Sequence, residues 1–174
     1  GKEKVFLFEE KKINNILYIN KTQPFDKTLP LQCILKSIST EGFQSSRTNA
    51  IALRRVTNEY EPSNKDIANT DKVYRYRITI RVLGIEMNIP LFILFRALGK
   101  VTDKEILSYI IYDNDDETLK NKLYDFLIPS IKDSQPVMDQ KSAYKLLSLN
   151  TKGKEAINVI DILQNNFFPN YKTD

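Results

Sequence analysis

The stretch "IPLFILFRALG" at residues 89–99 decides the fold class, because the hydrophobic pattern of the chain changes there. The stretch is apolar apart from Arg96, with Pro90 near its start and Gly99 at its end. Proline favours the first position of a helix, and glycine favours the position just past its end. We therefore predict a short buried helix over residues 90–98. We place Arg96 in its last turn, where a cation interacts favourably with the helix dipole and its stem can lie on apolar surface.

Before this stretch the apolar residues alternate with polar ones, as they do in strands. In "KVYRYRITIRV" (72–82) one face carries Tyr74, Tyr76, Ile78, Ile80 and Val82, and the other carries Val73, Arg75, Arg77, Thr79 and Arg81. Further strands are predicted at residues 5–8, 16–19, 31–40 and 48–56, with the first two joined as a hairpin. A polar loop follows at 57–71. Alternation of this kind predicts a sheet with one face on a core and the other toward solvent.

After this stretch the apolar residues recur at helical spacing. "TDKE" (102–105) has the form of a capping box, with Thr102 as N-cap and Glu105 three positions later. Helices are predicted at 103–111, at 116–130 ending near Pro129, at 139–149, and at 154–168 stopped by Pro169. The inward positions of the first two are Ile106, Leu107, Ile110, Leu119, Leu123, Phe126 and Leu127. Strands first and helices afterwards predict an α+β domain, in which an antiparallel sheet from the first half packs against a cluster of short helices from the second half.

The composition excludes several classes of site. The chain has 174 residues, a net charge of +4, one cysteine (Cys33) and no histidine. Disulfide frameworks, the usual zinc ligand sets and histidine-dependent nucleophiles are therefore not available. The five glycines form no phosphate-binding loop. We expect no catalytic residue, no bound cofactor and no metal in this chain, and neither a signal peptide nor a transmembrane helix.

Two charged features remain as candidate sites. The acidic run "DNDDE" (113–117) could hold a divalent metal, but it lacks the spacing of a calcium-binding loop, and acids are favoured at helix starts. We interpret it as a polar loop with capping acids. The second feature is a set of five arginines: Arg54, Arg55, Arg75, Arg77 and Arg81. Alternate strand residues lie about 6.6 Å apart on one face, so the arginines of residues 72–82 could meet phosphates. On the residues alone we favour a solvated outer face whose arginines pair with local acids, because an antiparallel sheet needs outward charges in any case.

The order of residues in "NIPLFILFRALGKVTDKEILSYIIYDNDD" (88–116) resembles the central motif of the lobe domain in the second-largest subunit of eukaryotic, archaeal and viral multisubunit RNA polymerases. The matching elements are Ile89-Pro90, Phe95-Arg96-Ala97-Leu98-Gly99, Asp103-Lys104-Glu105-Ile106 and Tyr112-Asp113. Residues 3–19 and 161–171 resemble the segments by which the chain leaves and re-enters the neighbouring protrusion domain, although Asn170 stands where the family commonly has histidine. The resemblance implies a segment leaving the protrusion at 1–19, a lobe at 20–160 and a returning segment at 161–174.

The resemblance also implies a function. It indicates a non-catalytic lobe domain that forms part of the DNA cleft wall near downstream DNA and offers a docking surface to transcription factors. The parent DNA-directed RNA polymerase joins nucleoside triphosphates, with its magnesium held in other domains. The expected partners are other polymerase domains and subunits, downstream DNA near the five arginines, and transcription factors, with no membrane. The expected location is intracellular: the nucleus in a cellular eukaryote, or the cytoplasm or virion for a large DNA virus. A stand-alone nucleic-acid-binding module or a protein-interaction domain remains the alternative.

Overall fold

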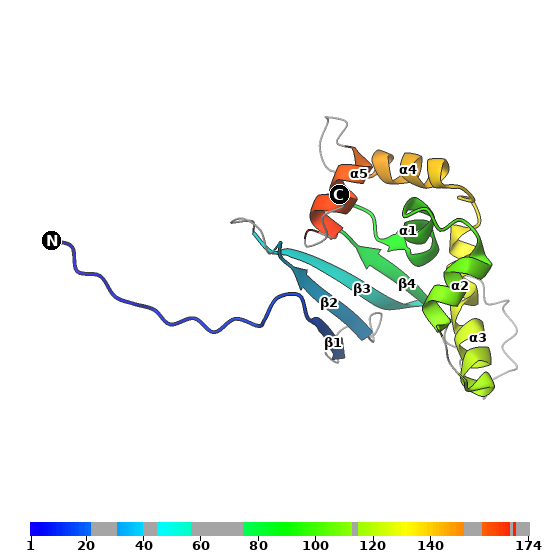
Figure 1. Ribbon diagram of the computed structural model, residues 1–174, viewed down its shortest axis with the longest axis horizontal. Coiled ribbons are helices and arrows are strands. Elements are labelled where there is room, and N and C mark those ends of the chain that lie inside the picture. The colour runs from blue at the N-terminus through cyan, green and yellow to red at the C-terminus, as the bar shows by residue number, and fades with distance from the viewer. Residues whose placement is uncertain are drawn as a thin grey trace, which may run out of the picture.

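The first half of the chain forms an antiparallel sheet. The computed structural model describes residues 1–21, 31–39, 45–56, 75–112, 115–151, 158–167 and 169. Within them five strands pair in the order β1-β2-β3-β4-β5. Their bounds are β1 Leu17–Lys21, β2 Leu31–Ser37, β3 Arg47–Val56, β4 Arg75–Arg81 and β5 Ile89–Pro90. Each strand pairs with its neighbour in the chain, so the sheet is a meander (Figure 1).

The second half is helical. The helices are α1 Leu91–Ala97, α2 Asp103–Ile111, α3 Glu117–Ser134, α4 Gln140–Leu149 and α5 Val159–Ile162, and α5 continues into a π-helical turn, η1 Leu163–Phe167. They gather around β4, whereas β1 and β2 lie on the side of the sheet away from them (Figure 1). The predicted α+β class, with a sheet from the first half against short helices from the second, is confirmed.

Helix α1 is the centre of the core, and it is the helix that the opening stretch predicts. It contacts α2, α3, α4, β4 and β5, and all its residues except Phe95 are buried. A helix that is apolar on every side is stable only when it is surrounded. It starts at Leu91 rather than at Pro90, because Pro90 is extended (ψ 140) and ends β5. Gly99 follows the helix with φ +93, a left-handed conformation that favours glycine.

Helix α2 has half of the predicted capping box. The Thr102 hydroxyl accepts a hydrogen bond from the backbone N–H of Glu105 at 3.4 Å. The Glu105 carboxylate does not complete the box. It accepts instead from Nζ of Lys100, in the link before α2, at 2.8 Å. Ile106 is buried, and Leu107 and Ile110 pack against the core as predicted. The threonine cap therefore fixes the start of α2, while the glutamate ties the preceding link to it.

Helix α3 corrects the prediction of a helix ending near Pro129, because it runs through Pro129 to Ser134. Proline removes one backbone donor and normally kinks or ends a helix. Here the residues beyond it are held by tertiary contacts: the buried Ser130 hydroxyl accepts from the N–H of Ile78 at 3.2 Å. Leu119 is also corrected, since it lies 43% exposed at the outer end of α3 rather than inward.

The predicted strand at 5–8 and its hairpin with 16–19 are wrong in this structure. Residues 1–16 form no helix or strand, and Figure 1 shows the N-terminal part of this segment running away from the domain. The side chains from Val5 to Phe8 are 84–100% exposed. Four apolar residues between charges have strand propensity, but they form a strand only when a partner edge is in reach. The loop at 57–71, together with Val73, Tyr74 and the start of the last predicted helix at 154–157, lies outside the described residues.

Candidate nucleic-acid interface

The sheet is a purely basic element. Strands β1 to β4 carry eight lysines and arginines: Lys21, Lys36, Arg47, Arg54, Arg55, Arg75, Arg77 and Arg81. The same strands contain no aspartate or glutamate. Since the whole chain carries +4, everything outside these strands sums to −4 (4 − 8). The positive charge of the protein is therefore concentrated on the sheet.

The strand register divides the five candidate arginines between two faces. Arg54 is the direct cross-strand partner of Arg77, and Arg81 is the partner of Ala50. Directly paired residues share a face, so Arg54, Arg77 and Arg81 lie together on what we call the basic face. Arg75 holds a position of the same parity, opposite Val56, although its side chain lies outside the described part. Arg55 pairs with Tyr76 and belongs to the opposite face, so the structure does not bring all five arginines together.

Arg77 has a local acidic partner. Its Nε donates to Asp133 Oδ2 on α3 at 2.7 Å, and the two side chains are 48% and 22% exposed. Burial raises the pKa of the Asp133 carboxyl, and the positive charge of Arg77 partly offsets that rise. A single Nε contact leaves the terminal nitrogens of the guanidinium for other acceptors. Arg77 is therefore positioned by α3, but part of its charge is neutralised within the domain.

Arg54 is held by the sheet itself. Its Nε donates to the Thr79 hydroxyl at 3.3 Å, a diagonal contact across β3 and β4. Like charges placed directly opposite on neighbouring strands destabilise a sheet, and Arg54 and Arg77 occupy such a pair. The neutral contact to Thr79 does not remove the charge of Arg54. An anion shared by Arg54 and Arg77 would relieve the repulsion between them.

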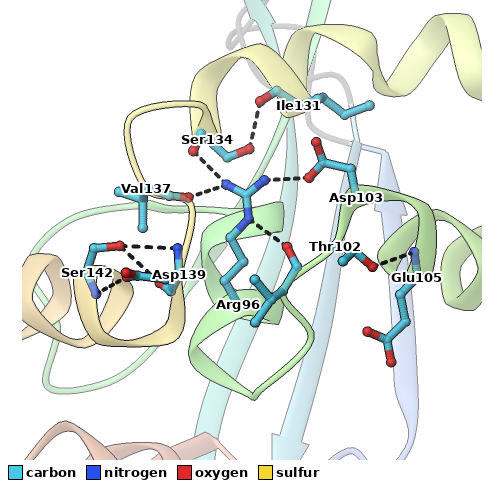
Figure 2. Close-up of polar contacts among 10 residues, drawn as sticks. Arg96, Thr102, Asp103, Glu105, Ile131, Ser134, Val137, Asp139 and Ser142 are labelled. Atoms are coloured by element: carbon cyan, nitrogen blue, oxygen red, sulfur yellow. Dashed lines mark hydrogen bonds and ion pairs between the residues drawn. The ribbon is translucent and has the colours of Figure 1, made fainter.

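Arg96, the charge within the opening stretch, is not part of any surface. It is 1% exposed, and its guanidinium is enclosed by the ends of three segments (Figure 2). It forms an ion pair with Asp103 at the start of α2. It also donates to the backbone carbonyls of Ser134 at 2.7 Å, of Val101 at 3.3 Å and of Val137.

This network corrects the expected role of Arg96. The arginine does lie in the last turn of α1, but the carbonyls that it satisfies belong to the end of α3 and to the loops beside it, not to its own helix. A buried guanidinium needs a partner for its charge and for its donors, and Asp103 with the three carbonyls supplies both. Arg96 therefore joins α1, α2 and α3, and it is not available to nucleic acid.

Asp116, in the acidic run at 113–117, caps a helix in the structure. The Asp116 carboxylate accepts from the backbone N–H of Thr118 at 2.9 Å and of Leu119 at 3.2 Å, at the N-terminus of α3. The hydrogen bond from the Thr118 hydroxyl is the main cause that lowers the pKa of Asp116. Residues 113 and 114 lie outside the described part. No group of three or more His, Cys, Asp or Glu side chains in the described ranges is arranged to hold a metal ion.

The chemistry that the basic face offers is the binding of anions. It offers guanidinium groups at strand spacing, which suit phosphate oxygens.

Among the helices that the structure describes, none is long and apolar enough to span a bilayer.

Asp133 is the site residue that the sequence reasoning missed. The predicted helix at 116–130, ending near Pro129, left Asp133 outside it, and with Asp133 its contact to Arg77 of β4. A usable signal existed, since Ser130, Asp133 and Ser134 lie at helical spacing beyond the proline.

The sequence matches known polymerase subunits. The family described as "RNA polymerase Rpb2, domain 2" matches residues 13–155. Among curated proteins, the DNA-directed RNA polymerase II subunit RPB2 of Encephalitozoon cuniculi is 28% identical over 82% of this chain. The DNA-directed RNA polymerase II subunit 2 of Arabidopsis thaliana is 27% identical over 97% of it. The subunit RPB2 of Schizosaccharomyces pombe is 26% identical over 99%.

The matched regions are a small part of those relatives. The chain spans 10%, 14% and 13% of their respective lengths. The family match covers most of the chain and includes all of the strands and α1 to α4. The chain belongs to the family of domain 2, the lobe, of the second-largest subunit of RNA polymerase.

Proposed function

We propose that this lobe domain forms part of the wall of the DNA cleft in a DNA-directed RNA polymerase, with its basic face toward the phosphate backbone of downstream DNA. The observation that carries the proposal is the charge of this face: the register places five basic residues on it, Lys36, Arg54, Arg75, Arg77 and Arg81, and β1 to β4 contain no acidic residue. Contacts of this kind position DNA without reading its sequence.

The geometry of the basic face supports this proposal over a solvated face of balanced charge. Among the arginines of this face whose side chains the structure describes, only Arg77 forms an ion pair with a described acidic residue, Asp133, while Arg54 is held by a neutral hydroxyl. Both contacts use Nε, so the terminal nitrogens remain for a phosphate. Arg81 is exposed on the same face. The face therefore keeps net positive charge after its internal pairs are counted.

The remaining parts of the proposal follow from the family. The domain is non-catalytic, and the parent subunit contributes to nucleotidyl transfer with magnesium held in other domains. Residues 1–19 leave the neighbouring protrusion domain and residues 161–174 return to it. The exposed apolar side chains from Val5 to Phe8 support this, because such residues normally pack against a partner. Other polymerase subunits and transcription factors are partners, and the nucleus is the proposed location.

The test is the salt dependence of DNA binding by polymerase that carries Arg54→Ala and Arg81→Ala. Each phosphate contact contributes about 0.9 to the slope of log affinity against log salt concentration, so the double variant should lower that slope by up to about 2. Asp133→Asn is the matched variant of opposite sign, because it removes the acid beside Arg77 and should strengthen DNA binding at low salt.

Two outcomes decide between the proposal and its alternatives. If the double variant keeps the salt slope and the DNA affinity but no longer binds a protein factor, the basic face is a surface for a protein partner. If the 174-residue chain alone binds duplex DNA as tightly as the polymerase does, the domain is a stand-alone nucleic-acid-binding module.

A further inference from the structure

The face of the sheet opposite the basic face is apolar in its centre, and only part of it is covered. One row of cross-strand partners runs from Ile19 through Cys33 and Ile51 to Ile80. Ile80 is 2% exposed beneath the helices, Ile51 is 39% exposed, and Ile19 is 67% exposed. The helical layer therefore ends over β4, apart from the contact of η1 with β3.

The uncovered part forms a continuous surface across three strands. The register places seven apolar residues there: Leu17, Ile19, Leu31, Cys33, Leu35, Ile51 and Leu53. We call this set the open apolar face. Leu17, Ile19, Leu31 and Ile51 are each more than a third exposed. A contiguous, exposed apolar surface on a sheet often marks an interaction site.

The charged residues that β1 to β3 place at the ends of the open apolar face are all basic. By the same register, Lys21 and Arg55 lie beyond one end of this face and Arg47 lies beyond the other. No acidic residue occurs in β1 to β4. An apolar surface with a basic rim is complementary to an apolar surface with an acidic rim.

The dimensions and the architecture specify the shape of the partner. Neighbouring strands lie about 4.8 Å apart, so β1 to β3 span about 10 Å, close to the diameter of one helix. Helices already cover the same face at β4, and one more beside them would complete the second layer. We propose that the open apolar face docks an amphipathic helix of another polypeptide, with an apolar stripe flanked by acidic residues. This rests on the proposed function, of which it specifies the protein-docking part.

Other occupants fit less well. A second copy of this chain would bring two strongly basic sheets together, and like charges across an interface are unfavourable. Nucleic acid needs donors for phosphate oxygens, which leucine and isoleucine side chains do not supply. The N-terminal segment at residues 5–8 is apolar, but in the structure it runs away from the sheet (Figure 1).

The single cysteine allows a direct test with the 174-residue chain. Cys33 lies at the centre of the open apolar face, half-buried and without a disulfide. The probe is a synthetic helical peptide of about 15–20 residues, long enough to form a helix, with a leucine stripe and glutamate flanks. Saturating peptide should slow the alkylation of Cys33 by a maleimide several-fold. A matched peptide with lysine flanks should not protect it, and neither should a DNA duplex.

Substitutions then locate the contact. Ile19→Asp or Ile51→Asp should weaken binding of the glutamate peptide about tenfold or more, because each places a charge in the apolar contact. Lys21→Glu should weaken it about two- to fivefold, as expected for an exposed charge pair. Ile128→Asp, on the outer surface of α3, is the matched control and should leave binding unchanged. Melting temperatures confirm that each variant is folded.

Several results would overturn the proposal. Equal protection by the lysine peptide, or insensitivity to Ile19→Asp and Ile51→Asp, would remove the basis for an acidic helical partner. Concentration-dependent protection of Cys33 without peptide would assign the face to self-association, and faster alkylation after deletion of residues 1–12 would assign it to the N-terminal segment. Because DNA binding uses the opposite face, failure of the peptide leaves the salt-slope experiment untouched, and failure of the salt-slope experiment leaves the peptide untouched.

Discussion

Ile19 and Ile80 are the same residue type on the same face of one sheet, in one row of cross-strand partners, yet one is 67% exposed and the other 2%. The difference between them is the helical layer, which covers β4 and leaves β1 uncovered (Figure 1). The alternation of apolar residues in the sequence thus predicts which face of a strand is suited to burial, but it does not predict which element buries that face. We infer that the β4 side supplies the stability of the domain and that the β1 side is kept for a partner.

The largest effect should follow from removing Arg96, which fixes the helices that cover β4. Arg96→Met leaves Asp103 without its counter-charge and three carbonyls without a donor, and should lower the free energy of unfolding by about 3–5 kcal/mol. Arg77→Met is the matched control in the exposed pair with Asp133 and should cost about 1 kcal/mol or less. Urea denaturation measures both. Similar losses for the two variants would mean that the Arg96 network does not hold the helical layer.

The isoleucine row gives the most direct test of the comparison. Ile80→Ala should cost about 2–5 kcal/mol, as should Leu94→Ala in α1, because each leaves a cavity in the core. Ile19→Ala should stay within about 0.5 kcal/mol, as expected for an exposed residue. The measurement is again urea denaturation of the isolated chain. If Ile19→Ala costs as much as Ile80→Ala, the β1 side is buried in solution and the open apolar face does not exist.

The sequence predicts the β4 side of the molecule better than the β1 side, for a physical reason. Strand β4 alternates strictly, and α1 carries proline at its start and glycine after its end, so local patterns and tertiary contacts agree there. At Val5–Phe8 the local pattern favours a strand, but no partner edge is present and the prediction fails. Pro129 is a local signal for the end of a helix, but α3 continues past it. Ser130 contacts β4 and Ser134 contacts Arg96, and these tertiary contacts hold the residues beyond the proline in the helix.

The candidate site was predictable in its parts but not in its arrangement. Alternation alone places Arg77 and Arg81 on one face of a strand. The pairing of Arg54 with Arg77 depends on the register between β3 and β4, since a slip of one residue would move Arg54 to the other face. Arg55 differs from Arg54 by that one position. The ion pair of Arg77 with Asp133 depends on a helix that is distant in the sequence, so no local pattern reveals it.

A smaller loss of stability is expected from a substitution at the edge of the helical layer, where η1 contacts β3. Asn49 is buried, and its Nδ2 donates to the carbonyls of Asn166 and Phe167, both at 3.0 Å, which attaches η1 to the sheet. Asn49→Ala removes that donor and should cost about 1–3 kcal/mol. Hydrogen exchange should rise in residues 159–167 more than in α1. Thr48→Ala, the exposed neighbour, is the control, and an equal rise for both would show that Asn49 does not define the edge of the layer.

The smallest effect is a pH dependence that should arise from two helix caps, Asp116 and Asp139, whereas β1 to β4 contain no carboxylate side chains. Hydrogen bonds from Thr118 and Ser142 lower the pKa values of the helix caps Asp116 and Asp139 below the ordinary 3.8. A carboxylate with a lowered pKa stabilises the folded state above its unfolded pKa, and that contribution is lost as pH falls through the folded pKa. Melting temperature should therefore decline as pH falls below about 4.

The double variant Asp116→Asn, Asp139→Asn keeps two good helix caps that do not titrate, so it should flatten this decline. Asp133 acts in the opposite direction, since burial raises its pKa and protonation relieves that cost. An unchanged decline in the double variant would place the acid-sensitive groups elsewhere and end the assignment of this pH dependence to the helix caps.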